Sequence, residues 1–86
     1  MARYSVSFRQ SVLKKDFDLI PKSDLRRIIE SIRSLADNPR PHGMKKLTNQ
    51  EQYRIRQGDY RIMYSIQDDD ALVHITKVAH RREIYR

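Results

Sequence analysis

Two runs of alternating apolar and polar residues, joined by a glycine and an aspartate, constrain the fold of this chain more than any other feature. Residues 52–57 and residues 60–67 both alternate with the period of two that is typical of a half-buried strand. The Gly58-Asp59 pair between them indicates a two-residue hairpin turn, because glycine readily adopts the positive φ that such a turn needs. A loop this short fixes the register of the two strands.

That register places three arginines on one face of the hairpin, which we call the arginine face: Arg54, Arg56 and Arg61. Arg56 lies directly across from Arg61, and Arg54 shares their side because side chains two apart on a strand point the same way. The residues between them point toward the expected core: Tyr53, Ile55, Tyr60, Ile62 and Tyr64. Like charges across a sheet are destabilising. We therefore expect an anion to bind here, first a nucleic-acid backbone and second a carboxylate-rich protein.

Ahead of the hairpin, the spacing of apolar residues predicts one strand and two helices. Residues 3–8 alternate strictly, which indicates a half-buried strand. Helical spacing covers residues 11–18, and Pro21 closes that segment. A second helix is expected to begin near Ser23, a suitable N-cap, and to end before Pro39.

The rest of the chain predicts a loop, the hairpin, a last strand and one helical turn. Residues 38–52 contain two prolines and a glycine and are expected to form a loop, and residues 71–79 return to the period of two. The fold class is therefore α+β, with a single domain spanning residues 1–86 in the order β-α-α-β-β-β. We expect both helices on one face of a mainly antiparallel, four-stranded sheet, and a short helical turn at the C-terminus.

The charge balance supports an anionic partner. Eighteen lysines and arginines against eleven acidic residues give a formal net charge of +7. A small basic domain is expected to meet a polyanion, although such a surface also keeps a domain soluble. The chain has no cysteine, no signal-peptide pattern and no apolar run of the roughly 18 residues that a membrane span needs. These observations predict a cytoplasmic protein with no membrane contact and no thiolate metal site, and the sequence has no motif that predicts a cofactor.

The last residues supply a second group of candidate site residues. His80 follows the last strand beside Arg81 and Arg82, whose charges favour the neutral imidazole that can act as a base. Tyr85 is suited to stacking on a nucleobase or donating a hydrogen bond. Whether His80 or Arg81 shares the arginine face depends on the turn at residues 68–70. A three-residue turn favours Arg81, and a two-residue turn favours His80.

The combined pattern resembles the RelE/ParE superfamily of toxins from bacterial type II toxin–antitoxin pairs, on its RelE branch. The resemblance covers essentially the whole chain and includes "NPRPHGMKKL", "YRIRQGDYRIMYSI" and "HRREIYR". It implies a metal-free messenger-RNA endonuclease that works on the ribosome, with a ribose 2′-OH attacking the adjacent phosphate in line. It also implies a cognate antitoxin as partner. We expect a monomeric toxin in the bacterial cytoplasm that assembles into a hetero-oligomer with that antitoxin.

The resemblance implies roles for individual residues. Arg61 is expected to be the central phosphate clamp, Arg81 a second clamp near the leaving group, and Tyr85 a group that orients or stacks the substrate. His80 is the expected general base, because arginines stand where a RelE-type sequence has lysines. The expected catalytic residues are Arg56, Arg61, His80, Arg81 and Tyr85, and the expected RNA-binding residues are Lys45, Lys46, Arg54 and Arg82. The alternative is a ParE-like, non-enzymatic inhibitor of DNA gyrase.

Overall fold

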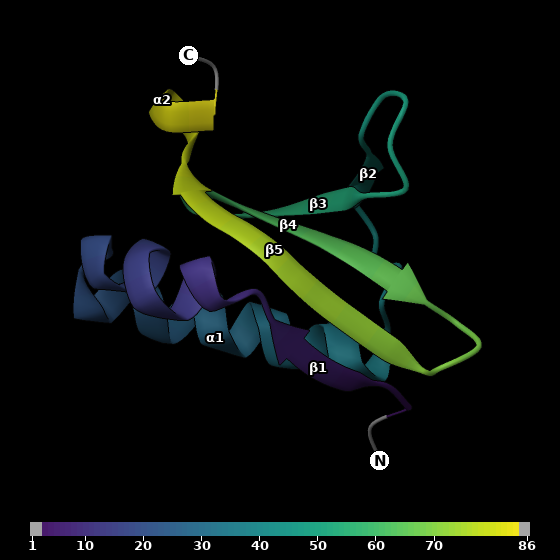
Figure 1. Cartoon of the computed structure of the whole chain (residues 1–86). Helices are drawn as coiled ribbons and strands as arrows, with labels where there is room; N and C mark the ends of the chain where they lie inside the picture. The colour runs from purple at the N-terminus through teal and green to yellow at the C-terminus, as the bar shows by residue number, and fades with distance from the viewer. Residues whose placement is uncertain (1–2, 85–86) are drawn as a thin grey trace.

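A twisted five-stranded sheet with a long helix across one face dominates the structure (Figure 1). The computed structural model describes residues 3–84 of the chain. Its elements are β1 (Ser5–Phe8), η1 (Val12–Asp16), η2 (Phe17–Leu19), α1 (Lys22–Asp37), β2 (Lys45–Lys46), β3 (Tyr53–Gln57), β4 (Tyr60–Gln67), β5 (Leu72–His80) and α2 (Arg81–Ile84). The strand order is β1-β5-β4-β3-β2, and all neighbours are antiparallel except the parallel pair β1 and β5. The predicted α+β class is confirmed, as is the C-terminal helical turn.

The sheet has one strand more than the sequence predicts. Lys45 and Lys46, inside the expected loop, form the edge strand β2 and pair with Arg54 and Tyr53 of β3. A strand of two residues is too short to show an alternating pattern, and the prolines and glycine before it are typical of a loop. The predicted count of four strands was wrong for this reason.

The first predicted helix is present as a helical segment, but it is not α-helical throughout. Residues 11–18 were expected to form one helix, but the structure has a single π-helical turn, η1, followed by a 3-10 turn, η2. η1 lies beside β5 and buries Val12 and Asp16, whereas Leu13 of η1 and Leu19 of η2 are exposed. The segment places Asp16 where its carboxylate accepts a backbone N–H of β5, as described below.

Helix α1 starts at Lys22, one residue before the predicted N-cap, Ser23. Pro21 occupies the N-cap position, and its carbonyl accepts the first helical hydrogen bond, from the N–H of Leu25 at 2.9 Å. Proline suits a helix start because it has no N–H to leave unsatisfied and its φ is already close to the required value. The predicted helix end before Pro39 is confirmed.

The core lies between α1 and the sheet. Ile28, Ile32 and Leu35 recur at helical spacing along α1 and are at most 2% exposed. They pack in one cluster with buried residues of β4 and β5, namely Ile62, Tyr64, Val73, Ile75 and Val78. Burying a side chain of this size contributes about 1.5–3 kcal/mol. This packing assigns one face of the sheet to the core and leaves the other for the arginines.

A bulge in β5 changes which residues share a face near the C-terminus. Thr76 is the extra residue, since Met63 pairs with Lys77 whereas the next residue, Tyr64, pairs with Ile75. The Thr76 hydroxyl lies 2.8 Å from Oε1 of Gln52 and 3.2 Å from the carbonyl oxygen of Met63. An extra residue in one strand reverses the alternation of the side chains beyond it.

The buried Asp16 carboxylate takes the place of a strand at the edge of β5. β1 pairs with β5 only as far as Phe8, and η1 follows along the same edge. There, Asp16 Oδ2 accepts the backbone N–H of Val78 at 3.0 Å, and Oδ1 lies 3.1 Å from Nζ of Lys77. Asp16 is 4% exposed, so its charge is satisfied by these two donors inside the fold.

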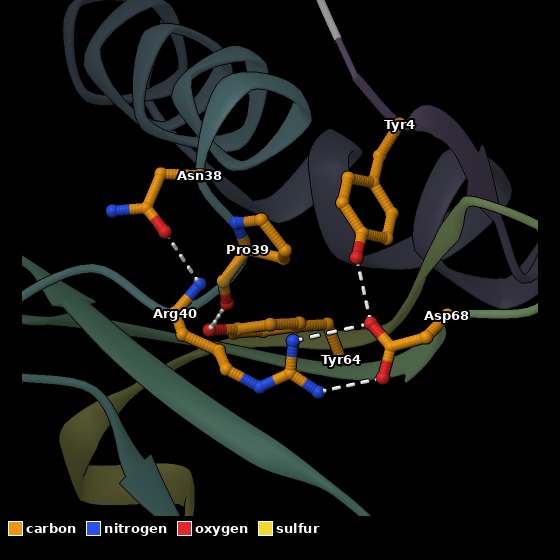
Figure 2. A network of polar contacts seen from close by, with 6 residues as sticks. All are labelled: Tyr4, Asn38, Pro39, Arg40, Tyr64 and Asp68. Atoms are coloured by element: carbon orange, nitrogen blue, oxygen red, sulfur yellow. Dashed lines mark hydrogen bonds and ion pairs between the residues drawn. The ribbon is translucent and has the colours of Figure 1, made fainter.

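A polar network fixes the start of the loop between α1 and β2 (Figure 2). The Arg40 guanidinium donates to both oxygens of Asp68, at 3.1 and 2.8 Å, and the Tyr4 hydroxyl donates to the same carboxylate at 2.6 Å. The buried hydroxyl of Tyr64 donates to the carbonyl of Pro39 at 2.8 Å. These contacts connect the N-terminal strand, the β4–β5 turn and the chain leading to β2.

The Asp68 carboxyl is expected to titrate far below its ordinary range. The hydrogen bonds from Arg40 and Tyr4 lower its pKa from 3.8 to about 2. Because the folded pKa lies below the unfolded one, the stabilisation is complete above about pH 4 and disappears as the pH falls through 2. Carbon-detected NMR titration of the Asp68 carboxyl should give a midpoint near 2 in wild type and a higher one in Arg40→Gln. Equal midpoints in the two proteins would show that the ion pair does not form.

Removing the Tyr64 hydroxyl should destabilise the fold without disturbing its packing. Tyr64→Phe leaves the Pro39 carbonyl without its buried donor, which we expect to lower the free energy of unfolding by about 1–2 kcal/mol. Tyr53→Phe is the control, because its half-buried ring packs 6.0 Å from that of Tyr64 and should change stability by no more than about 0.5 kcal/mol. Urea unfolding measures both. An unchanged Tyr64→Phe would contradict the assigned hydrogen bond.

Candidate nucleic-acid interface

The hairpin has the register that its two-residue turn predicts. Gln57 pairs with Tyr60, and Arg56 pairs with Arg61. Gly58 has a φ of +60°, a conformation that a side chain would strain. Residues directly opposite each other in a sheet point to the same side, so the arginine face exists as predicted.

The arginines of this face line one groove of about 340 Å³, which we call the arginine groove. Its lining residues are Gly43, Lys45, Arg54, Ile55, Arg56 and Arg61. Arg61 comes from β4, near the middle of the sheet, and is only 5% exposed, whereas Arg56 on β3 is exposed. A buried guanidinium acts on an anion through less water than an exposed one, so its charge is felt more strongly. The arginine groove therefore combines one buried guanidinium, that of Arg61, with more exposed cations.

β2 separates the two lysines that the sequence grouped together. Lys45 pairs with Arg54 and shares its side, while Lys46 pairs with Tyr53, whose ring packs against the core. The Lys46 ammonium lies 3.4 Å from Oε1 of Glu51. The structure thus brings Lys45 into the arginine groove but not Lys46. Sequence reasoning missed this division because it placed both residues in a loop, where side chains have no fixed alternation.

The structure does not bring His80 to the arginine groove. Ala79 pairs with Arg61, and His80 pairs with Tyr60 on the side of the core, with ring centroids 5.4 Å apart. The β4–β5 turn has four residues, 68–71, rather than the two or three considered, and the bulge at Thr76 also shifts the register. The four-residue turn and the bulge together determine which residues of β5 share the face of Arg61.

His80 has a different local partner. Its Nδ1 accepts the backbone N–H of Arg82 at 3.2 Å, which caps the first turn of α2. A neutral imidazole that accepts at Nδ1 carries its proton on Nε2 and has no further lone pair with which to take a proton. This arrangement gives His80 a structural contact at the start of α2, and its general-base role stays a prediction from the sequence.

Arg81 and Arg82 lie in the C-terminal turn, α2. The backbone N–H of Arg81 donates to the Asp59 carbonyl at 2.8 Å, which ties α2 to the turn of the hairpin (Figure 1). Arg81 is the first residue of α2, directly after β5, and both Arg81 and Arg82 are exposed. Neither residue lines the arginine groove. Tyr85 lies outside the described residues.

Two further properties concern the described part of the chain alone. Within residues 3–84, no three His, Cys, Asp or Glu side chains gather closely enough to hold a metal ion. In the same residues, no helix combines the length and apolar character required to cross a membrane.

Comparison with known proteins gives a consistent result in sequence and in structure. A family model described as the ParE toxin of the type II toxin–antitoxin system, parDE, matches residues 6–85. A protein of Methanocaldococcus jannaschii whose name assigns it to the RelE1 toxins is 32% identical over 88 residues, covering 98% of this chain and 97% of that protein.

Two solved structures have the same fold over nearly the whole chain. One is the archaeal RelE–RelB complex of Pyrococcus horikoshii OT3, with a TM-score of 0.81, 32% identity and coverage of 92% of this chain and 96% of that chain. The other is the RelBE2 toxin–antitoxin complex of Mycobacterium tuberculosis, with a TM-score of 0.80, 28% identity and 94% coverage of both chains. Because the family match and the relatives span almost its full length, this chain belongs to the RelE/ParE superfamily of toxins from type II toxin–antitoxin systems.

Proposed function

We propose that this toxin is a messenger-RNA endonuclease that acts on the ribosome, in the manner of the RelE branch. The observation that carries the proposal is the arginine groove, in which Arg54, Arg56 and Arg61 converge on one open face of the sheet. Phosphate is the anion that such planar, permanently charged side chains bind best. The basic net charge of +7 favours a nucleic acid as the source of that phosphate.

The proposed reaction is an in-line attack by a ribose 2′-OH on the adjacent phosphate. It leaves a 2′,3′-cyclic phosphate and a 5′-hydroxyl, and negative charge accumulates on the non-bridging oxygens in the transition state. Cations that are already in position stabilise this charge without having to reorganise. In the proposal, the buried Arg61 binds the scissile phosphate. Arg54 and Arg56, which belong to β3, bind the same phosphate or the adjacent one.

The C-terminal turn is proposed to close the same substrate site from one end. The backbone of Arg81 is tied to the hairpin turn beside the strand of Arg61, so we assign Arg81 a contact with a phosphate next to the scissile one. Arg82 is assigned to RNA binding, and Tyr85 to stacking on a base of the substrate. His80 is left out of the chemistry because it faces the core side and caps α2.

A cognate antitoxin is the proposed partner of the toxin in the cell. The solved relatives are described as toxin–antitoxin complexes, and a basic toxin is most simply neutralised by an acidic chain laid over its surface. We propose a monomeric toxin that acts in the cytoplasm, where ribosomes and messages are found.

The second candidate function is inhibition of DNA gyrase by binding, without cleavage. It is favoured by the family match, because the matching model describes ParE toxins. A gyrase binder has no chemical need for a groove of converging guanidiniums, which is why we place this function second.

A reconstituted translation reaction distinguishes the two functions. We expect wild-type toxin to cut messages at mapped codon positions when ribosomes are present, to leave naked RNA intact, and to leave gyrase supercoiling unchanged. Intact messages together with blocked supercoiling would reverse the order of the two candidates.

A further inference from the structure

One cation of the arginine groove is a primary ammonium, a group that can act as a proton donor. The guanidiniums of Arg54, Arg56 and Arg61 keep their protons at any physiological pH. Lys45 lines the same groove and has a primary ammonium, which can give up a proton and recover it from water. The groove therefore contains three permanent charges and one proton donor.

The position of Lys45 follows from the pairing of β2. Lys45 lies across from Arg54, so its side chain rises from the edge strand on the side of the arginines. It is also exposed, which allows water to restore its proton after each reaction. Its neighbour Lys46 points to the other side and pairs with Glu51. β2 thus presents one lysine, and not two, to the groove.

Among residues 3–84, two other groups that can exchange protons, His80 and Lys77, are engaged elsewhere. His80 faces Tyr60 on the core side, and its Nδ1 already accepts the N–H of Arg82. Lys77 comes from the side of the arginines, but its ammonium lies 3.1 Å from the buried carboxylate of Asp16. Removing Lys77 from that carboxylate would leave a buried charge without its ion-pair partner.

We propose that Lys45 is the general acid of the cleavage reaction, an inference that rests on the proposed endonuclease function. As the 2′-oxygen bonds to phosphorus, the bond from phosphorus to the 5′-oxygen breaks, and Nζ of Lys45 gives its proton to the departing 5′-oxygen. The proton of the 2′-OH passes to water, and the neutral amine of Lys45 regains a proton from water. The three guanidiniums hold the phosphate throughout and exchange no proton.

The variant that separates proton donation from charge is Lys45→Arg. It keeps a positive charge in the groove but cannot donate a proton at neutral pH. Loss of a general acid typically slows a reaction about 10²–10⁴-fold, so we expect Lys45→Arg to cut a ribosome-bound message at least about 100-fold more slowly than wild type. Lys22→Arg, at the start of α1 and away from the groove, is the matched control and should cut at the wild-type rate.

A second substrate tests whether Lys45 donates a proton to the leaving group. In a message with sulfur in place of the bridging 5′-oxygen at the cut position, the leaving group is a thiolate, which departs without a proton. Lys45→Arg should cut this message at nearly the wild-type rate. If a folded Lys45→Arg protein cuts both messages slowly, Lys45 has a binding role and the proposal is overturned. The proposal is also overturned if Lys45→Arg cuts the oxygen message at the wild-type rate.

Failure of the endonuclease itself gives a different result. If wild-type toxin cuts neither message on the ribosome, the proposed function and this inference both fall. If wild type cuts and Lys45→Arg cuts the oxygen message equally well, the endonuclease stands and only the role of Lys45 is wrong. Thermal unfolding of each variant shows that a rate change does not come from an unfolded protein.

Discussion

Arg61→Ala should abolish cleavage of ribosome-bound messages, with a rate at least about 100-fold below that of wild type. Removing one preorganised donor from the developing charge of a transition state costs about 10²–10³ in rate. Arg61 is the most buried charged side chain in the arginine groove, and it lies on a central strand. The other cations that line the groove, Lys45, Arg54 and Arg56, are more exposed than Arg61. Initial rates on a single mapped codon measure the effect.

The control for Arg61→Ala is Arg33→Ala. Arg33 is an exposed arginine of α1, on the opposite side of the sheet, so its loss removes the same charge without touching the groove. We expect it to cut at nearly the wild-type rate. Because Arg61 is buried, its variant must also be shown to fold, by its circular dichroism and its thermal midpoint. A folded Arg61→Ala protein that cuts as fast as Arg33→Ala would remove Arg61 from the proposed site.

Asp16→Ala should cause the largest loss of stability of any single change to a polar residue proposed here. The substitution removes the acceptor of the Val78 N–H and the buried partner of Lys77. A hydrogen bond to a charged group contributes about 1.5–3 kcal/mol. We expect the free energy of unfolding to fall by about 2–4 kcal/mol, since a buried amide at the sheet edge also loses its acceptor.

Asp18→Ala is the matched control for Asp16→Ala. Asp18 is an exposed carboxylate two residues further along the same segment, and its removal should change stability by no more than about 0.5 kcal/mol. Urea unfolding of both variants at neutral pH measures the difference. If the two variants unfold at the same urea concentration, the edge of β5 does not depend on the carboxylate of Asp16.

The hairpin could be predicted from the sequence because its determinants are local. Alternation in residues 52–57 and 60–67 sets the faces, and Gly58 sets the turn and therefore the register. The three arginines of the groove follow from these facts alone. Helix α1 and its buried face could also be predicted from the sequence, because its apolar residues repeat at helical spacing over several turns.

The rest of the site depends on contacts between distant residues. The bulge at Thr76 forms where its hydroxyl meets Gln52 and the Met63 carbonyl, and no local pattern reveals that meeting. Without the bulge, the side on which His80 lies cannot be assigned. β2 likewise exists only because β3 offers an edge to pair with, and Lys45 gains its place in the groove through that pairing.

The central claim is that a ribose 2′-OH of the message attacks a phosphate held in the arginine groove. The most direct test is a message with a single 2′-deoxynucleotide on the 5′ side of the mapped cut, compared with the unmodified message on the same ribosomes. We predict that wild-type toxin cuts the unmodified message to a 2′,3′-cyclic phosphate and leaves the deoxy message whole at that position. Equal cutting of both messages at that position would show that the 2′-OH is not the nucleophile and would contradict the account.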